Sequence, residues 1–201
     1  MKFQKTLFLL LLFLSCKSEP LLDYETAAKN CRIDTVRFTG PNGQGEGYSM
    51  SYDGLIGAQL PDFAAKTMDG KEINKSYFEG KVSVINFWFI GCHPCEDEMP
   101  VFNQMVEKYK DKNINFLALS RNSPSDVTTF LSNHPFNVDH IAYAEPLIED
   151  VFHAAWGYPI TMVADQNMKI VHITRGLGTV GQLTDSQKEF NRVLDGALAA
   201  K

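Results

Sequence analysis

The stretch Asn86–Pro100, NFWFIGCHPCEDEMP, decides what this chain folds into and what chemistry it carries. It starts within an apolar run, Val82–Ile90, whose β-branched and aromatic side chains predict a central strand buried on both faces. It runs on into Cys95–Lys110, where apolar residues three and four positions apart predict an amphipathic helix. Cys92 and Cys95 therefore stand where a buried strand passes into a helix.

The spacing of Cys92 and Cys95 predicts a redox-active pair. With two residues between them inside a first helical turn, the two sulfur atoms can close a short disulfide. At a helix N-terminus, unpaired backbone N–H groups and the helix dipole favour the thiolate form of Cys92, which is the nucleophile in disulfide exchange. Cys95 lies one turn deeper and would then act as the resolving thiol.

The residues beside the cysteines are expected to adjust the reduction potential of the pair. A protonated His93 would favour the thiolate of Cys92 and make the couple more oxidising, and we place Pro94 beside it as a second tuning residue. The acidic run 96–98 (EDE) suits a helix N-terminus but opposes a nearby thiolate. These effects have opposite signs, so the sequence assigns no potential.

A zinc site and a structural disulfide are the two other uses of such a pair. A zinc site needs further ligands, but the sequence has no second C-x-x-C, and Cys31 stands alone. A strand-to-helix junction is a strained and exposed place for a purely structural bridge. We therefore expect no metal and no cofactor.

The first fifteen residues are predicted to be a signal peptide of the lipoprotein type. Lys2 and Lys5 precede the apolar run Leu7–Leu14, which is too short to span a bilayer but suits a signal peptide. The run ends in FLSC at residues 13–16, which resembles a bacterial lipobox, so Cys16 is the predicted lipid anchor. An ordinary secretory peptide with a chance cysteine at its end is the alternative.

Removal of this segment would leave an acidic, lipid-anchored domain outside the cytoplasm. The full chain has 19 Lys and Arg against 24 Asp and Glu, a net charge of −5, and loss of Lys2 and Lys5 leaves 17 against 24, or −7. An acidic chain without a basic run is a poor candidate for binding nucleic acid. Lys17 after Cys16, where inner-membrane lipoproteins carry Asp, favours a periplasmic place on the outer membrane.

The 201 residues suit one domain of about 150 residues plus an extension, because 44% are hydrophobic and 21% charged. We predict a tether and N-terminal extension over 16–57 and a folded domain over 58–201. Within the extension we expect a polar tether at Lys17–Lys29, strands at Ile33–Thr39 and within Gly45–Gly57, and a turn at 40–43.

The folded domain is predicted to alternate strands and helices. Asp69-Gly70 is a hairpin signal, and Thr184–Gln187 (TDSQ) has the form of a helix capping box. Further strands are expected at Ile114–Ser120, His140–Ala144, Ile160–Ala164 and Lys169–Thr174, and further helices at Ser125–Asn133, Leu147–Ala155 and Thr184–Ala199. This order predicts an α/β fold with a mixed central sheet flanked by helices.

The cysteine motif resembles the TlpA/ResA-like family of membrane-tethered thioredoxins, whose pattern is roughly N-F-W-x-x-W-C-x-P-C-x-x-E-x-P. Leu60–Phe63 (LPDF) fits the family's lead-in, and Gly157–Thr161 (GYPIT) resembles its cis-proline segment. Matching pieces run from about residue 58 to 200. The resemblance implies a thioredoxin-like fold for this part, with the N-terminal β extension in front of it.

The resemblance implies roles by position. Cys92 would be the attacking thiol, Cys95 the resolving thiol and Pro159 the cis-proline beside them, with Tyr158 lining the substrate contact. A plain trans proline is the alternative at Pro159. Trp88 is expected in the core or at the rim of the site, and we place it among the candidate substrate contacts.

Glu98 matches the acidic residue that the family pattern associates with proton transfer to the second cysteine. Thioredoxins proper carry a buried Asp where this chain has Asn86, and Asn cannot titrate, so Glu98 gains interest as the proton carrier. A solvated carboxylate at a helix start is the alternative. Gly91 in place of the usual Trp, and Ile160 in place of a Thr, leave the identity of the substrate open.

Two further residues lie outside the motif. Cys31 is a lone thiol, with burial, capping and pairing between chains as its possible states. His153 is close enough to Pro159 in sequence to reach the site, but a core or surface role is expected for it.

We therefore expect an extracytoplasmic thiol–disulfide oxidoreductase that acts on protein cysteines in the reducing direction. The resemblance implies cysteine-containing protein substrates, apocytochrome c among them, and a membrane thiol donor of the DsbD/CcdA type. A thiol peroxidase of the AhpC/TSA type is one alternative, but its P-x-x-x-T-x-x-C motif would need a Thr at Phe89. A non-catalytic binding module of the same fold is another, and the cysteine pair with Pro159 argues against it.

Overall fold

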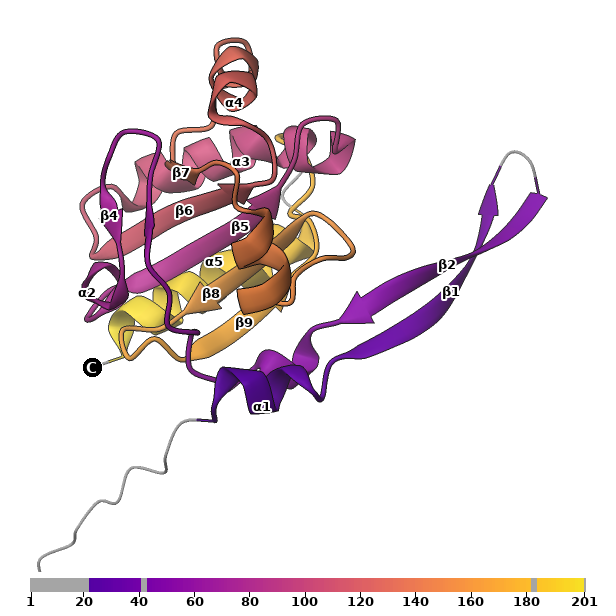
Figure 1. Ribbon diagram of the computed structural model, residues 1–201, viewed down its shortest axis with the longest axis horizontal. Coiled ribbons are helices and arrows are strands. Elements are labelled where there is room, and N and C mark those ends of the chain that lie inside the picture. Colours follow the sequence, from indigo (N-terminus) through magenta and orange to yellow (C-terminus); the bar gives the residue numbers. More distant parts are fainter. Residues whose placement is uncertain (1–21, 41–42, 182–183, 201) are drawn as a thin grey trace, which may run out of the picture.

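The fold is built on a mixed β-sheet with β5 (Val82–Trp88) at its centre. The computed structural model describes residues 22–40, 43–181 and 184–200 (Figure 1). In that part of the chain the largest sheet has five strands in the order β7-β6-β5-β8-β9. Every residue of β5 is buried, as the apolar run predicts, although the strand ends at Trp88 rather than at Ile90.

The neighbours of β5 run in both directions. β6 (Ile114–Ser120) lies parallel to β5, and β7 (Asp139–Ile141) continues that side in parallel. β8 (Ile160–Ala164) and β9 (Ile170–Thr174) form an antiparallel hairpin on the other side. The predicted α/β class and mixed sheet are therefore confirmed.

Two hydrophobic cores cover the two faces of the sheet, because successive side chains of a strand point to opposite faces. Val84 packs into the core formed with α3 (His93–Tyr109) and α5 (Asp185–Ala199). Ile85 packs into the other core, to which η2 (Leu147–Val151), a single turn of π-helix, contributes. The predicted helix over Leu147–Ala155 is thus shorter than expected.

Side-chain caps fix the starts of two helices. Ser123 accepts a hydrogen bond from the backbone of Asp126 at the start of α4 (Pro124–Leu131). Thr184 accepts one from the backbone of Gln187 (3.1 Å) at the start of α5. The Gln187 amide donates instead to the carbonyl of Leu177 (2.8 Å), so the structure supports one half of the predicted capping box.

From residue 22 onward the structure corrects the predicted polar tether over Lys17–Lys29, whereas residues 17–21 of that prediction lie outside the described residues. α1 (Tyr24–Ala28) forms there, and the Asp23 carboxylate caps it by accepting from the backbone of Thr26 (2.9 Å). Tyr24 is buried in the sheet core and donates to the carbonyl of Phe152 (2.7 Å). This end of the extension is therefore packed onto the folded domain.

β1 (Arg32–Gly40) and β2 (Gly43–Ser51) form an arm that extends away from the body of the protein (Figure 1). Within the described residues they pair with each other and with no further strand. Both predicted strands are confirmed, and the second begins earlier than expected. Part of the predicted turn, residues 41–42, lies outside the described residues. The arm leads through η1 (Asp53–Leu55) back to the domain.

A small hairpin, β3 (Ala65–Lys66) with β4 (Glu72–Ile73), follows the lead-in segment and confirms the Asp69-Gly70 turn. The side chain of Thr67 donates to the Asp69 carboxylate inside that turn. The next element, α2 (Lys75–Phe78), carries no signal long enough for sequence analysis to find.

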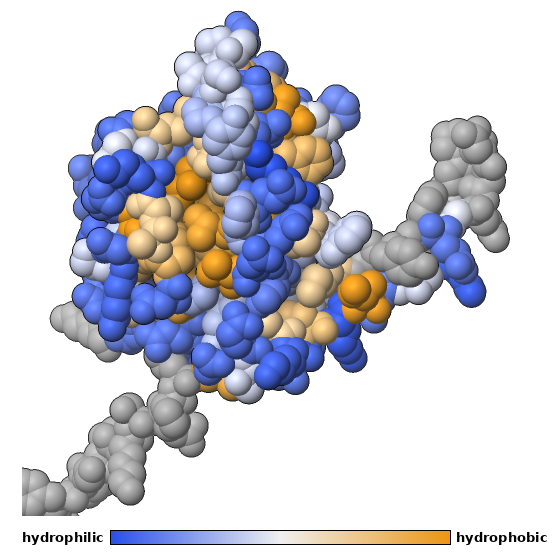
Figure 2. All heavy atoms as spheres, in the orientation of Figure 1, coloured by the Kyte–Doolittle hydropathy of each residue, from blue (hydrophilic) through white to orange (hydrophobic). Residues whose placement is uncertain are grey.

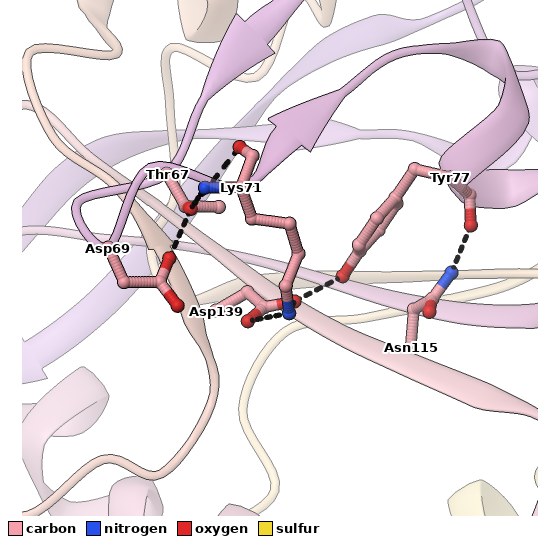
Figure 3. A network of polar contacts seen from close by, with 6 residues as sticks. All are labelled: Thr67, Asp69, Lys71, Tyr77, Asn115 and Asp139. Atoms are coloured by element: carbon pink, nitrogen blue, oxygen red, sulfur yellow. Dashed lines mark hydrogen bonds and ion pairs between the residues drawn. The ribbon is translucent and has the colours of Figure 1, made fainter.

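Figure 3 shows how this hairpin is fastened to the sheet. The ammonium of Lys71 lies 2.6 and 2.7 Å from the two carboxylate oxygens of Asp139, on the edge strand β7. The hydroxyl of Tyr77 donates to the same carboxylate (2.8 Å). The amide of Asn115 on β6 donates to the carbonyl of Tyr77 (2.7 Å). The hairpin, α2 and two strands thus share one polar network.

The face of the protein in Figure 2 is largely hydrophilic. Figure 2 shows hydrophilic side chains around a hydrophobic area in the middle of the face in view. None of the helices in the described ranges combines the length and apolar composition needed to cross a membrane. Cys16 and the predicted signal peptide lie outside the described residues.

Candidate redox site

Cys92 and Cys95 form a disulfide at the start of α3. Their sulfur atoms are 2.00 Å apart and their Cα atoms 5.3 Å apart. Both side chains are buried, and Cys92 is the N-cap residue of the helix. The structure therefore places the pair where the sequence predicts it, beside the unpaired N–H groups and the positive end of the helix dipole.

A tight turn carries the chain from β5 into α3. Gly91 has a φ of 91°, a backbone conformation that favours glycine. Its N–H donates to the carboxylate of Glu96 (2.9 Å), and the N–H of Ile90 donates to the side-chain oxygen of Asn122 (2.8 Å). These two hydrogen bonds hold the backbone of the turn in place just before Cys92.

His93 points into solvent, with 90% of its side chain exposed. Its Nδ1 atom is 3.8 Å from the Glu96 carboxylate. Water screens charges in such a position, so a charge on His93 acts weakly on the buried sulfur atoms. Pro94 lies in the first turn of α3, where the missing N–H removes no helical hydrogen bond.

Glu98 is the buried carboxyl of the site, with an exposed fraction of 1%. It accepts hydrogen bonds from the Asn86 amide (3.0 Å) and from the backbone of Leu177 (2.8 Å). Burial raises the pKa of Glu98 to about 7, and the two hydrogen bonds partly oppose that rise. The alternative of a solvated carboxylate is wrong. Because Glu98 follows Cys95 by three positions, both lie on one face of α3.

Asn86 links Glu98 to the neighbouring strand. Its amide nitrogen donates both to the Glu98 carboxylate and to the hydroxyl of Thr161 on β8 (2.9 Å). Register explains the contact, because Asn86 and Thr161 are direct partners across β5 and β8. Sequence analysis noted Asn86 but missed Thr161 and Leu177, whose contacts depend on tertiary packing.

The peptide bond between Tyr158 and Pro159 is cis, as the resemblance implies. The ring of Tyr158 packs edge-on against Phe89 in the turn before the cysteines, with 5.2 Å between centroids. The Tyr158 hydroxyl accepts a hydrogen bond from Arg121 (3.0 Å), which follows β6. Arg121 also pairs with Glu149 (3.0 Å). The sequence gives no signal for this arginine.

An open groove of about 510 Å³ has Cys92 in its lining. Its lining comes from the turn before α3, the start of α3, Arg121 and the loop that precedes Pro159. The residues are Phe89, Gly91, Cys92, His93, Pro94, Arg121, Ala155, Trp156, Gly157 and Tyr158. The groove thus gives a substrate access to Cys92, the cysteine predicted to attack.

The sequence profile of the AhpC/TSA family matches residues 56–173, more than half of the chain. The chain belongs to the AhpC/TSA family. It is 29% identical over 140 residues to the thiol-disulfide oxidoreductase ResA of Bacillus thuringiensis subsp. konkukian, covering 67% of this chain and 78% of ResA. It is 29% identical over 168 residues to the thioredoxin-like protein YneN of Bacillus subtilis, covering 81% and 92% of the two chains.

Solved structures agree with this placement within the AhpC/TSA family. A Chlorobium tepidum protein assigned as the thiol:disulfide interchange protein DsbE matches with a TM-score of 0.59 and 25% identity, over 70% of this chain and 96% of that one. The fold is thioredoxin-like, and the chain is similar to thiol–disulfide oxidoreductases of the ResA/TlpA type. The predictions of family, fold and enzyme class are confirmed.

Trp88 does not lie where a substrate could contact it. Its side chain is fully buried and packs against the rings of Phe130, Phe136 and His140. It offers no surface to a substrate, so its proposed place among the substrate contacts is wrong. Its position alternates with that of Phe87 on β5, which sends it into the helix-covered core.

Cys31 lies in the N-terminal extension, and His153 lies in the folded domain, where it contacts that extension. Cys31 is the free thiol among the described cysteines, half-buried, and burial raises its pKa, which keeps it in the less reactive thiol form. His153 pairs with Glu25 of α1 (3.1 Å) and stacks on Tyr24. Neither lines the groove that Cys92 lines.

Two further features of the described residues lie apart from the redox chemistry. A hollow of about 360 Å³ is lined by residues of α1, α2 and the segment 59–63, and it contains neither cysteine of the pair. Within the described ranges, no group of three or more His, Cys, Asp or Glu side chains is arranged to hold a metal ion.

Proposed function

We propose that this protein reduces disulfides in cysteine-containing protein substrates outside the cytoplasm. The observation that carries the proposal is the Cys92–Cys95 pair at a helix N-terminus, with Cys92 in the lining of a groove and the buried carboxyl of Glu98 one helical turn beyond Cys95. Relatives named thiol-disulfide oxidoreductase support the exchange chemistry.

The reaction begins from the reduced pair. The thiolate of Cys92 attacks one sulfur atom of a substrate disulfide, a mixed disulfide forms, and the second substrate sulfur leaves as a thiolate that takes up a proton. Cys95 then loses its proton and attacks the sulfur of Cys92, which releases the first substrate sulfur. The substrate gains two electrons and two protons, and the pair ends as the disulfide seen in the structure.

Glu98 supplies a place for the proton of Cys95. A carboxyl with a pKa of about 7 is partly ionised at neutral pH, so it can both accept and return a proton there. Asn86 and the backbone of Leu177 hold both of its oxygen atoms, which keeps the carboxyl inside the protein rather than turned toward solvent. Glu98 therefore exchanges a proton with the buried thiol of Cys95, which lies one helical turn earlier in α3.

A dithiol donor must reduce the pair after each turnover. The family resemblance points to a membrane thiol donor of the DsbD/CcdA type, and apocytochrome c is one candidate substrate. Lipidation of Cys16 would hold the domain at the periplasmic side of the outer membrane. A Cys16→Ser variant is then expected in the soluble periplasmic fraction, whereas the unchanged protein is expected with the membranes.

The peroxidase alternative has little support from the site. Phe89 occupies the position where a peroxidase of the AhpC/TSA type needs Thr, and its ring packs on Tyr158, so it offers no hydroxyl to a peroxide. A non-catalytic role would leave the cysteine pair and the cis Pro159 without a use.

A trapping experiment tests the proposal. A Cys95→Ala variant cannot resolve the mixed disulfide, so substrates should remain bound to Cys92 through a bond that a thiol reductant breaks. A Cys92→Ala, Cys95→Ala double variant is the control, because it has no attacking thiol at the site. Equal recovery of disulfide-linked proteins on both variants would count against the proposal.

A further inference from the structure

Trp156 stands out because it is a large aromatic side chain that faces solvent beside a redox pair. It is 65% exposed and lines the groove over Cys92, three positions before the cis Pro159. A free tryptophan ring in water loses the benefit of burying its apolar surface. Its exposure in this groove points to something that covers the ring during function.

The backbone around Trp156 is held by three side chains from separate parts of the chain. The carbonyl of Trp156 accepts a hydrogen bond from the Tyr52 hydroxyl (2.7 Å). The carbonyls on either side of it, those of Ala155 and Gly157, accept from Arg121 (3.3 Å) and Arg175 (2.9 Å). Three consecutive carbonyls are thus fixed, so the loop presents the ring without having to rearrange.

Tyr52 comes from the N-terminal extension. The family match begins at residue 56, so this support of the loop lies in the part of the chain that precedes it. Tyr24 of α1 also holds the loop through the carbonyl of Phe152. Gly157 fits the same arrangement, since a Cβ there would lie 2.5 Å from the guanidinium of Arg175.

Gly91 lines the groove at the position where the family pattern has a Trp before the first cysteine. A Cβ on Gly91 would meet no atom within 4 Å, so no neighbouring side chain fills the space beside this glycine. The aromatic surface of the groove therefore comes from Phe89, Tyr158 and the exposed Trp156.

The groove is suited to an apolar rather than a charged partner. Arg121 is the lining residue with a permanent positive charge, and the carboxylates of Glu149 (3.0 Å) and Glu145 (3.6 Å), which lie outside the lining, more than offset it. An acidic peptide would meet two carboxylates, and a basic one would find no unpaired carboxylate among the lining residues.

We propose that Trp156, positioned by Tyr52, is a specificity-determining contact that takes a bulky apolar side chain adjacent to the disulfide cysteine of an extended substrate peptide. The inference rests on the proposed function, because it names the substrate class of the same groove. Tyr52 acts through the loop and is a positioning residue, whereas Trp156 contacts the substrate.

Two peptides test this subsite. Each is closed by one intramolecular disulfide, and they differ in a single residue beside one cysteine, Phe in the first and Ser in the second. Single-turnover oxidation of the reduced full chain, followed by thiol alkylation and mass spectrometry, gives a rate for each peptide. An aromatic contact of the usual strength predicts a rate about 10-fold higher for the Phe peptide.

Trp156→Ala is expected to lower the Phe rate to the Ser rate, and Tyr52→Phe to reduce the ratio between them. Met68→Ala, an exposed apolar residue outside the groove, and Tyr109→Phe, which removes a hydroxyl hydrogen-bonded to Asp195, are matched controls expected to keep the wild-type ratio. Circular dichroism establishes that each variant is folded.

The outcomes separate the two proposals. Equal wild-type rates for the two peptides, or a Trp156→Ala variant that keeps the preference, would overturn the subsite. Failure of the wild-type protein to reduce either peptide and also bis(2-hydroxyethyl) disulfide would instead overturn the proposed function, since that small disulfide needs no side-chain contact.

Discussion

At the scale of single residues, Glu98 gives the cysteine pair its proton chemistry. The carboxyl is buried and two donors hold it in place. Burial of a carboxylate costs free energy, and buried ionisable groups with shifted pKa values are typical of functional sites. Asn86 occupies the strand position where thioredoxins proper carry an Asp, and here it orients the acid rather than acting as one.

The pH dependence of the resolving step follows from the pKa of Glu98. Ionised Glu98 accepts the Cys95 proton, so the rate of substrate release from the mixed disulfide should rise as pH increases through about 7. Glu98→Gln should remove that inflection and slow the step about 10²-fold at pH 8. Asp97→Asn changes an exposed carboxylate one position earlier and should keep the inflection. An unchanged pH profile in Glu98→Gln would assign the proton to another group.

The same group makes stability depend on pH. Burial raises the pKa of Glu98 from 4.5 to about 7, so between these values the unfolded chain loses a proton that the folded protein keeps. The free energy of unfolding should therefore fall as pH rises from 4.5 to about 7, by on the order of 3 kcal/mol from this group. Urea titrations of the oxidised protein measure this, and the Glu98→Gln variant should lose that part of the decline. A decline of equal size in the variant would contradict the assignment.

The sequence predicts those residues of the site that belong to short sequence motifs, and it misses those that reach the site only through tertiary packing. Cys92, Cys95 and the cis Pro159 stand in short motifs, and the structure joins the two cysteines in a disulfide and places Tyr158, the residue before Pro159, in the same groove lining as Cys92. Trp88 stands in the same motif but points to the core, because strand alternation decides its direction. Arg121 carries no motif, and its contact with Tyr158 exists only after the strands are assembled.

At the scale of elements, the β3–β4 hairpin depends on the Asp139 carboxylate that Figure 3 shows. One carboxylate there serves both Lys71 and Tyr77, and burial, together with that carboxylate, raises the pKa of Tyr77. Asp139→Ala should lower the free energy of unfolding by about 1–3 kcal/mol, because it leaves partly buried donors unsatisfied.

Urea denaturation of the oxidised protein checks this value. Glu72→Ala is the matched control in the same hairpin, because it breaks an exposed ion pair with Lys66 and should leave the midpoint unchanged. An equal response of the two variants would mean that the network in Figure 3 does not anchor the hairpin.

Elements with long apolar runs are predictable, and short ones are not. The segments that form β5, β6 and β8 (VSVINFW, INFLALS and ITMVA) are mostly apolar and contain β-branched or aromatic residues, which favour strands. α1 has five residues and depends on Tyr24 entering a core formed by distant segments. A sequence window that short carries no period, which is why a tether was expected there.

At the scale of the whole molecule, the described part of the chain consists of a two-core domain and a projecting two-stranded arm (Figure 1). An isolated two-stranded hairpin is marginally stable in water. The amide protons of β1 and β2 should therefore exchange with solvent through local opening, much faster than those of β5, which require global unfolding.

Hydrogen exchange followed by mass spectrometry measures this difference. The β5 amides serve as the internal reference because their strand has partners on both sides. Arm amides as protected as those of β5 in a dilute monomer would contradict the expectation of local opening.

The central claim is that disulfide exchange at Cys92 and Cys95 is the activity of this protein. Its most direct measurement is the rate at which the protein, supplied with a dithiol, reduces the disulfides of a model protein. The wild type should exceed the dithiol alone, Cys92→Ala should fall to the rate of the dithiol alone, and Cys31→Ala, which alters the half-buried free thiol, should match the wild type. Equal rates for the wild type and Cys92→Ala would contradict the claim.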